Sequence, residues 1–504
     1  MLVGLDIGTT GARAVAIDLA GRVVTAASAE YPLLTPRPGW TEQDPEDWWA
    51  ATRAVLGEVC AQIREPVLGL GLTGQMHGAV FLDAGDQVIR PAILWNDQRT
   101  AAQCAEITDR IGRARLIEIT GNPAVTGFQA PKLLWLRDQE PAAYARVRHL
   151  LLPKDYVRLR LTGEFATDAS DASGTLLLDL RTRTWSPEVL DALDIPRGWL
   201  PEVFEGPDVT GFVSRRAAAE TGLPEGLSVA AGGGDNAAAA VGSGIVTEGL
   251  VSCSIGTSGV IFAPSDTPRV DPGGRLHAFC HAVPGAYHLM GVTLAAGGSL
   301  RWWRDLLAND LDYDGLTSLA AQAPPGSEGL LFLPYLAGER TPHLDSLARG
   351  AFIGLGLRHS LAHLTRAVME GVCYSLKDSL DLMSAQGLPI QQIRATGGGA
   401  ASPVWRQMQS DVFGLPIFRT TIDEGAAYGA ALLAGVATRF YAAVSDACGV
   451  VRVGSEVNNP NPAQRLLYSR YHEVFARAYD AAAPIMHELA ELAPMFTDST
   501  LGRI

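Results

Sequence analysis

The sequence predicts an α/β protein of two domains, each with a mixed β-sheet flanked by helices. The first observation is the length of 504 residues, because one hydrophobic core rarely serves more than about 250–300 residues. The second is a strand–turn–strand pattern at residues 2–24. The third is an echo of its turn about half a chain later, where residues 255–259 (IGTSG) repeat residues 7–11 (IGTTG). These observations predict a duplicated fold with domains at 1–245 and 246–504.

The first turn places hydroxyl and backbone N–H groups beside a carboxylate. Residues 2–7 are almost all apolar and fit a buried strand that carries Asp6 near its end. Such a turn suits a phosphate, and the neighbouring carboxylate can hold Mg²⁺ directly or through water. In the echo, Ser254 replaces the carboxylate. One Gly–Thr hairpin alone is commonly structural, but the pair predicts a nucleotide site. The two turns consist of Gly8, Thr9 and Thr10, and of Gly256, Thr257 and Ser258.

Composition narrows the classes of partner. A net charge of −14 argues against nucleic acid or an anionic membrane as the main ligand. The six cysteines are scattered without a C-x-x-C pair, which is typical of a reducing compartment, so we expect a cytoplasmic protein. No apolar run approaches 18 residues without a charge or a glycine cluster, and the start of the chain lacks a basic and apolar leader pattern. We therefore expect no membrane span.

In the first half, polar clusters follow two predicted strands. A strand at 67–72 leads into Gln75, Met76 and His77, and a strand at 92–95 ends in Asn96 and Asp97. Ligands of open α/β sheets bind where strands end, so both clusters are candidate binding loops. His77 is equally consistent with a loop histidine whose hydrogen bonds are internal. The pair at 96–97 is equally consistent with a cap for the helix that follows.

A third strand, at 228–231, runs into three glycines, Gly232–Gly234, and then Asp235. Glycines let another molecule approach the backbone closely, and here they present one acid at the end of a strand. The alternative is that Asp235 only caps the alanine-rich helix after it.

The second half repeats this plan. After the hairpin at 251–263, residues 293–300 lead into a helix, and apolar residues at helical spacing predict a core helix at 361–380. A strand at 393–396 ends in three glycines, Gly397–Gly399, which are followed by Ser402 and a helix. This arrangement suits the base, ribose or phosphates of a nucleotide, but by itself it is a weak motif. Residues 425–435 form a small-residue helix able to pack tightly. Pro484 should break or kink the last helix.

Together these features resemble the FGGY family of carbohydrate kinases, within the actin-like, ribonuclease-H-like ATPase superfamily. The resemblance runs from Gly4 to about Gly435. Its specific parts are the Asp6 loop, residues 127–132 with Trp135, residues 232–236 and residues 350–369. Within the family, residues 73–78 and 94–97 resemble the members that act on D-xylulose. Residues 436–504 match nothing diagnostic.

The resemblance implies ATP-dependent phosphorylation of a ketopentose, foremost D-xylulose, in a cleft between two actin-like domains. Asp235 would be the general base, and Asp6 and Asp235 would hold Mg²⁺. Sugar contacts are expected from Gln75, Met76, His77, Trp95, Asn96, Asp97, Asp235 and Asn236. ATP contacts are expected from Gly8, Thr9, Thr10, Arg13, Gly256, Thr257, Ser258, Gly297, Gly397, Gly398, Gly399 and Ser402. The expected partners are a sugar and ATP, without nucleic acid or membrane, and a homodimer is left open.

Three alternatives remain at the level of sequence. The substrate could be ribulose, gluconate or glycerol, since sugar choice rests on few side chains. The protein could be a nucleotide-gated chaperone or filament protein of the same superfamily, although such a protein has no need for the loops around His77 and Asp235. It could also be a sugar sensor without activity, against which the intact Asp6 and Asp235 argue.

Overall fold

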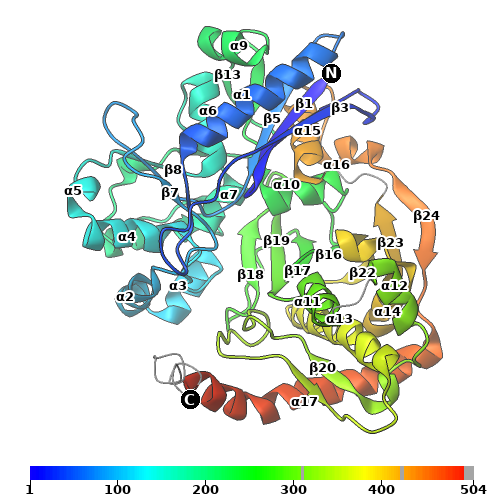
Figure 1. The fold of residues 1–504 in the computed structure, drawn as a ribbon. Coiled ribbons are helices and arrows are strands. Elements are labelled where there is room, and N and C mark those ends of the chain that lie inside the picture. The colour runs from blue at the N-terminus through cyan, green and yellow to red at the C-terminus, as the bar shows by residue number, and fades with distance from the viewer. Residues whose placement is uncertain (308–310, 421–424, 493–504) are drawn as a thin grey trace, which may run out of the picture. The chain divides into compact units, whose positions relative to one another are not determined.

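A computed structural model describes residues 1–307, 311–420 and 425–492 (Figure 1). The chain forms two compact units, each built around a mixed sheet. The first unit contains Met1–Thr247, Pro264–Leu289 and Glu424–Arg452. The second contains Glu248–Ala263, Met290–Asp423 and Val453–Ile504. The predicted fold class is thus confirmed. The domain limits at residue 245 remain a prediction, because compactness does not test independent folding.

The sheet of the first unit has the strand order β13-β14-β5-β1-β2-β3. Its central strand β1 is antiparallel to β2 and parallel to β5, and β5 is parallel to β14. The strands are β1 (Leu2–Ile7), β2 (Gly11–Ile17), β3 (Val23–Glu30), β5 (Gly69–Gly74), β13 (Val209–Phe212) and β14 (Ser228–Ala230), with β15 (Gly233–Gly234) also pairing with β5.

Helix α1 (Pro45–Gln62) packs on one face of this sheet. It begins where the sequence favours a helix start, because the Asp44 side chain accepts a hydrogen bond of 3.0 Å from the backbone N–H of Glu46 and proline follows the cap. Alternate residues of β1 (Val3, Leu5 and Ile7) join the core that contains Trp48. The period of two along a strand leaves the residues between them, Gly4 and Asp6, on the other face.

Helix α15 (Gly425–Ala437) belongs to the first unit and packs against β1 and β5. The approach is close: a Cβ atom on Gly4 would lie 1.8 Å from the carbonyl oxygen of Ala427, and one on Gly71 would lie 1.8 Å from that of Ala430. Glycine is therefore required at these two strand positions, because any side chain would meet the helix backbone. The predicted tight packing of this small-residue helix is confirmed.

The first unit contains further elements around its sheet. Its other helices are α2 (Ala101–Ile111), α3 (Arg113–Thr120), α4 (Gln129–Gln139), α5 (Pro141–Tyr144), α6 (Pro153–Thr162), α7 (Ala169–Ala172), α8 (Pro187–Ala192), α9 (Arg215–Thr221), α10 (Asp235–Gly242) and α16 (Val444–Ala447). Its short strands are β4 (Glu42–Gln43), β6 (Val80–Leu82), β7 (Ala92–Ile93), β8 (His149–Leu151), β9 (Ala166–Asp168), β10 (Leu178–Asp179), β11 (Thr184–Trp185), β12 (Glu202–Phe204) and β18 (His277–Cys280).

The sheet of the second unit repeats the connectivity of the first. Its strands run in the order β18-β19-β17-β16-β22-β23-β24. As with β1, the central strand β16 is antiparallel to the next strand in sequence and parallel to β22, which is parallel to β23. The strands are β16 (Gly249–Ile255), β17 (Gly259–Ser265), β19 (Tyr287–Thr293), β22 (Ile390–Thr396), β23 (Ile417–Thr420) and β24 (Val453–Asn458), with β20 (Leu331–Leu333) and β21 (Ala351–Ile353) in a separate pair.

Helices complete the second unit. They are α11 (Gly297–Leu307), α12 (Tyr313–Ala320), α13 (Leu361–Ala385), α14 (Pro403–Phe413) and α17 (Pro462–Leu492). The core helix expected at 361–380 is α13. Helix α17 continues through Pro484. The expectation that Pro484 breaks this helix is therefore wrong. Within the described parts of the chain, no helix has the length and apolar character needed to cross a bilayer.

Candidate active site

Two carboxyl groups of the first unit ionise close to neutral pH. Asp6 lies next to the end of β1, opposite Arg13 on β2, and Asp235 opens α10. Burial raises the pKa of Asp6 to about 7, with the charge of Asp235 adding to the rise and Arg13 opposing it. Burial also raises the pKa of Asp235 to about 6, against hydrogen bonds from Asn236. A carboxylate with such a pKa is a stronger proton acceptor than an ordinary one.

The bonds around Asp235 come from its neighbour. Its Oδ1 atom accepts hydrogen bonds from the backbone N–H of Asn236 at 2.7 Å and from Asn236 Nδ2 at 2.9 Å. The carboxylate therefore bonds the N–H of the next residue only, and α10 has Gly234 at its N-cap position without a side-chain capping bond. The capping alternative, which used the N–H groups after Asn236, has no such bond among the described residues. An asparagine at position 235 could accept the same bonds, which makes its substitution a clean test of charge.

The pair of carboxylates has the chemistry of a magnesium site. The Oδ1 atom of Asp6 is buried and has no hydrogen-bond partner among the described residues. Mg²⁺ prefers oxygen ligands and is usually held by one or two carboxylates, with water and phosphate oxygens filling the rest. The described residues contain no group of three or more His, Cys, Asp or Glu side chains that could hold a metal alone. Asp6 and Asp235 thus fit a metal that arrives with phosphate.

The turn after β1 is held by side chains from elsewhere in the first unit. Gly8 N–H donates to the carbonyl oxygen of Gly11 at 3.1 Å. The carbonyl oxygen of Thr9 accepts from Gln43 Nε2 at 2.8 Å, and its hydroxyl oxygen lies 3.0 Å from Trp95 Nε1. Tyr31 donates its hydroxyl to the carbonyl of Gly8. The predicted phosphate turn is therefore a fixed element. Of the other predicted residues there, Thr10 is exposed and Arg13 bonds Ser28 Oγ at 2.8 Å.

Gln43 also connects this turn to the predicted sugar loop. Its Oε1 atom accepts from Gln75 Nε2 at 2.9 Å and from Trp48 Nε1 at 3.0 Å, while its Nε2 atom holds Thr9. Gln43 is fully buried. Sequence reasoning missed this residue, because its contacts join segments far apart in the chain and leave no local pattern.

His77 has an unusual backbone that its neighbours hold in place. Its φ is 68°, in the left-handed region, and its carbonyl oxygen accepts from Lys132 Nζ at 2.7 Å. Its ring nitrogen Nδ1 lies 2.6 Å from the carbonyl oxygen of Gly174, which fixes the proton on Nδ1. The ring is half-buried beside Phe128 at a centroid distance of 4.7 Å. Burial lowers the pKa of Lys132 well below its ordinary value, although Asp97 opposes the shift.

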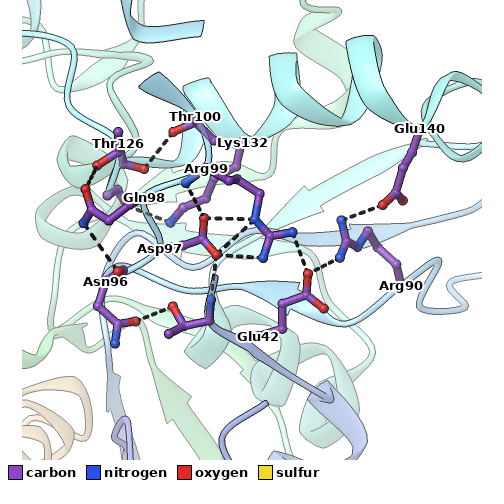
Figure 2. A network of polar contacts seen from close by, with 12 residues as sticks. Glu42, Arg90, Asn96, Asp97, Gln98, Arg99, Thr100, Thr126, Lys132 and Glu140 are labelled. Atoms are coloured by element: carbon purple, nitrogen blue, oxygen red, sulfur yellow. Dashed lines mark hydrogen bonds and ion pairs between the residues drawn. The ribbon is translucent and has the colours of Figure 1, made fainter. Parts of the chain in front are cut away.

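Asn96 and Asp97 of the cluster at 95–97 belong to one network of polar contacts (Figure 2), in which both bond Thr41. The Asp97 carboxylate is fully buried, accepts from Arg99 Nη2 at 2.7 Å and accepts from the backbone N–H of Thr41 at 2.7 Å. Asn96 Oδ1 accepts from Thr41 Oγ1 at 2.7 Å. Trp95 is 41% exposed and reaches the phosphate turn. The geometry gives Asp97 a structural role, and its sugar contact remains a prediction without support.

The second unit contains a separate pocket of about 290 Å³. Its walls are formed by the loops after β16 and β22, the first turns of α11 and α14, and residues Tyr313, Asp314 and Thr317 of α12. The N-termini of α11 and α14 therefore face it. The predicted residues in its lining are Gly256, Thr257, Gly297, Gly398, Gly399 and Ser402. Gly397 and Ser258 belong to the same loops but do not line the pocket. Lining residues that sequence reasoning missed include Arg301, Asp314 and Trp405.

Glycine is required where these loops meet. The N–H groups of Gly297 and Gly298 donate to the carbonyls of Gly256 and Thr257 at 2.8 and 3.0 Å. A Cβ atom on Gly297 would lie 2.4 Å from the carbonyl oxygen of Gly256, and one on Gly399 would lie 2.6 Å from Ile255 Cβ. By contrast, a Cβ on Gly398 would have only one neighbour, at 4.0 Å. The loops thus form a rigid apolar slot with Ser402 capping α14 at one wall.

Two units of the same connectivity, each with a Gly–Thr turn after its central strand, have the arrangement expected of the actin-like class. Comparisons with known proteins identify the group. The model for the N-terminal domain of the FGGY family of carbohydrate kinases matches residues 1–242, and that for the C-terminal domain matches residues 251–438. The chain belongs to the FGGY family of carbohydrate kinases, as its resemblance implied.

Individual relatives cover nearly the whole chain. A xylulose kinase of Lactococcus lactis is 43% identical over 97% of this chain and 98% of its own. A xylulose kinase of Escherichia coli is 42% identical over 96% of this chain and 100% of its own. The crystal structure of a xyloylose kinase from Brucella ovis has a TM-score of 0.91 at 38% identity, covering 96% and 99% of the two chains. The chain is therefore a sugar kinase, a phosphotransferase that acts on an alcohol group.

Proposed function

We propose that this protein transfers the γ-phosphoryl group of ATP to the terminal hydroxyl of D-xylulose, giving D-xylulose 5-phosphate and ADP. The relatives named above support the sugar. The observation that carries the chemistry is Asp235, a carboxylate at the start of α10 whose pKa is raised to about 6. Such a group is ionised at neutral pH and still basic enough to accept a proton in the transition state.

In this proposal Asp235 orients the 5-hydroxyl and takes its proton as the oxygen attacks the γ-phosphorus. The bond to the β-γ bridging oxygen breaks, and ADP leaves with that oxygen. Phosphoryl transfer needs mainly alignment and charge neutralisation, so few other groups are required. Asp6 and Asp235 would hold Mg²⁺, which neutralises charge on the phosphates when bound. The metal-binding role of Asp6 rests on its unpartnered Oδ1. That of Asp235 rests on its lying close enough to Asp6 for its charge to raise the pKa of that carboxyl.

Each unit would bind one substrate. Gln75, Met76 and His77 of the first unit would contact the sugar, together with Trp95, Asn236 and Asp235. The slot around Gly398 and Ser402 in the second unit would take the nucleoside, and the two Gly–Thr turns would hold the phosphates. Because transfer is direct, the γ-phosphate must reach Asp235, and water must be excluded from it.

An assay of ADP release tests this function against its alternatives. The purified protein is given MgATP with D-xylulose, D-ribulose, D-gluconate, glycerol or no sugar, and ADP is followed by a coupled enzyme reaction. We expect the highest kcat/KM with D-xylulose and little release without sugar. A higher kcat/KM with another compound would reassign the substrate. Equal release in every sample would favour a nucleotide-gated ATPase, and no release would favour a sensor.

A further inference from the structure

A fully buried group of charges lies beneath the candidate active site of the first unit. Lys154 Nζ is 2.6 Å from Asp155 Oδ1, 2.9 Å from Asp168 Oδ1 and 3.2 Å from Asp171 Oδ2. Burial by itself would lower the pKa of Lys154, but these three carboxylates raise it above its ordinary value. The lysine is therefore a permanent cation that holds Asp168 in one orientation. Removing either partner would leave a buried charge uncompensated.

Asp168 in turn holds Ser170 in place through two hydrogen bonds. The second oxygen of Asp168 accepts from the backbone N–H of Ser170 at 2.7 Å and also accepts the hydroxyl proton of Ser170. Because that proton is committed to Asp168, the Ser170 hydroxyl oxygen acts as an acceptor on its other side. There it receives the backbone N–H of Gly234 at 3.1 Å. We call Lys154, Asp168 and Ser170 the buried anchor.

Gly234 is the residue directly before Asp235. It occupies the N-cap position of α10, which has no capping side chain of its own. The Ser170 hydroxyl is thus a side-chain contact that fixes the peptide group between Gly233 and Gly234, one residue before the proposed general base. A small rotation of that peptide group would move Gly234 and redirect the Asp235 carboxylate.

The same segment also fixes the predicted sugar loop. Four residues after Ser170, the carbonyl oxygen of Gly174 holds His77 Nδ1 at 2.6 Å. Met76 fills the space between the two contacts: a Cβ on Gly174 would lie 2.9 Å from Met76 Cε, and one on Gly234 would lie 2.8 Å from Met76 Cγ. One buried segment therefore contacts the Asp235 loop at one point and the His77 loop at another.

We infer that the buried anchor is a positioning device for catalysis, and that Ser170 is its terminal positioning residue, which aligns Asp235 with the sugar held at His77. Ser170 touches no substrate in this account and acts through Gly234. The inference rests on the proposed role of Asp235 as general base. It predicts that loss of the Ser170 hydroxyl affects the chemical step more than the binding of either substrate.

The variant Ser170→Ala tests this in the full-length protein. Misplacing a reacting group by about 1 Å can cost about 100-fold in rate, so we expect kcat to fall by about 10- to 100-fold. The KM values for D-xylulose and ATP should stay within about twofold, since the contacts made in the ground state are kept. The matched control is Ser186→Ala, which removes another buried serine hydroxyl that accepts a backbone N–H, from Val189 at 3.3 Å, in the same unit.

Two comparisons decide the outcome. If both variants lose similar thermal stability but only Ser170→Ala loses kcat, the inference stands; if both keep kcat, or both lose it equally, it is wrong. Ser170→Cys provides a weaker acceptor of similar size and should give a kcat between those of wild type and Ser170→Ala. If Ser170→Ala does not fold, Ser170→Cys against Ser186→Cys gives the same comparison.

A double variant separates this inference from the proposed function. In an Asp235→Asn background, Ser170→Ala should lower kcat no further, because the group it positions is already gone. Undiminished turnover in Asp235→Asn alone would overturn the role of Asp235. A large kcat loss in Asp235→Asn, with a further and independent loss on adding Ser170→Ala, would overturn only the positioning role of Ser170.

Discussion

At the scale of residues, burial sets the pKa of the two carboxyl groups to which we assign the chemistry. Asp6 and Asp235 are ordinary acids in composition, yet removal from water raises both pKa values, to about 7 and about 6. The sequence located both residues by the glycines near them. It did not reveal that Asp97, another carboxylate in a loop after a strand, forms a buried ion pair with Arg99. That difference depends on which partner the fold brings to each carboxylate.

The substitution Asp235→Asn should lower kcat by about 10²–10⁴-fold, the usual loss when a general base is removed. Thermal stability and the binding of D-xylulose and MgATP should change little, because the asparagine oxygen can accept the bonds from Asn236. Steady-state kinetics, calorimetric binding and a melting curve measure the three quantities. A variant that lost thermal stability and kept its turnover would instead support a capping role.

The pH dependence of the wild-type enzyme should report the same group. Asp235 accepts a proton only when ionised, and Asp6 holds Mg²⁺ only when ionised, so kcat/KM should begin to fall below about pH 7 and fall more steeply below about pH 6, the raised pKa values of these two carboxyls. The fall should approach tenfold per pH unit while Asp6 alone takes up a proton and exceed it once Asp235 does as well. Measurement between pH 4.5 and 8 with D-xylulose tests this. A kcat/KM value that stays constant down to pH 5 would contradict the assignment.

His77 should affect the sugar and not the nucleotide. Loss of one buried polar partner costs about 1–3 kcal/mol, so His77→Ala should raise the KM for D-xylulose strongly while the KM for ATP stays near normal. Initial rates with each substrate varied in turn provide the comparison. An equal rise in both KM values would point to general disruption of the fold around the Lys132 contact.

At the scale of elements, strands and helix starts were predictable and their partners were not. The apolar run of β1, the Asp44 cap of α1 and the glycine turn after β22 each have a local signature, and each is present. The link through Gln43 has none, because it joins the turn after β1 to the loop after β5 by side-chain bonds alone. Local sequence patterns indicate backbone preference and burial. They do not predict hydrogen bonds between side chains that lie far apart in the chain.

The Gln43 link makes a prediction about the phosphate turn. Gln43→Glu keeps an oxygen for Trp48 and Gln75 but loses the N–H that holds Thr9. The freed turn should bind phosphate less well, and one lost hydrogen bond of about 1.4 kcal/mol corresponds to about a tenfold rise in the KM for ATP. The KM for D-xylulose should rise less. An unchanged KM for ATP would show that the turn does not depend on Gln43.

At the scale of the whole molecule, the repeated IGTTG and IGTSG turns were the strongest signal of duplication, and the two sheets do share one connectivity. The sequence did not predict which segments belong to which unit. Residues 264–289 and helix α15 belong to the first unit although they follow its echo in the chain. Their assignment depends on close contacts such as Ala427 against Gly4, which only the folded chain creates.

Identification of the product shows most directly whether this protein phosphorylates the 5-hydroxyl of D-xylulose. The protein is incubated with MgATP and D-xylulose, and the sugar phosphate is analysed by mass spectrometry and by ¹³C–³¹P coupling. Our account predicts one sugar phosphate for each ADP, with phosphorus coupled to C5 and C4, and a greatly slowed reaction for Asp235→Asn. A phosphate on another carbon, ADP formed without sugar phosphate, or undiminished turnover by Asp235→Asn would contradict it.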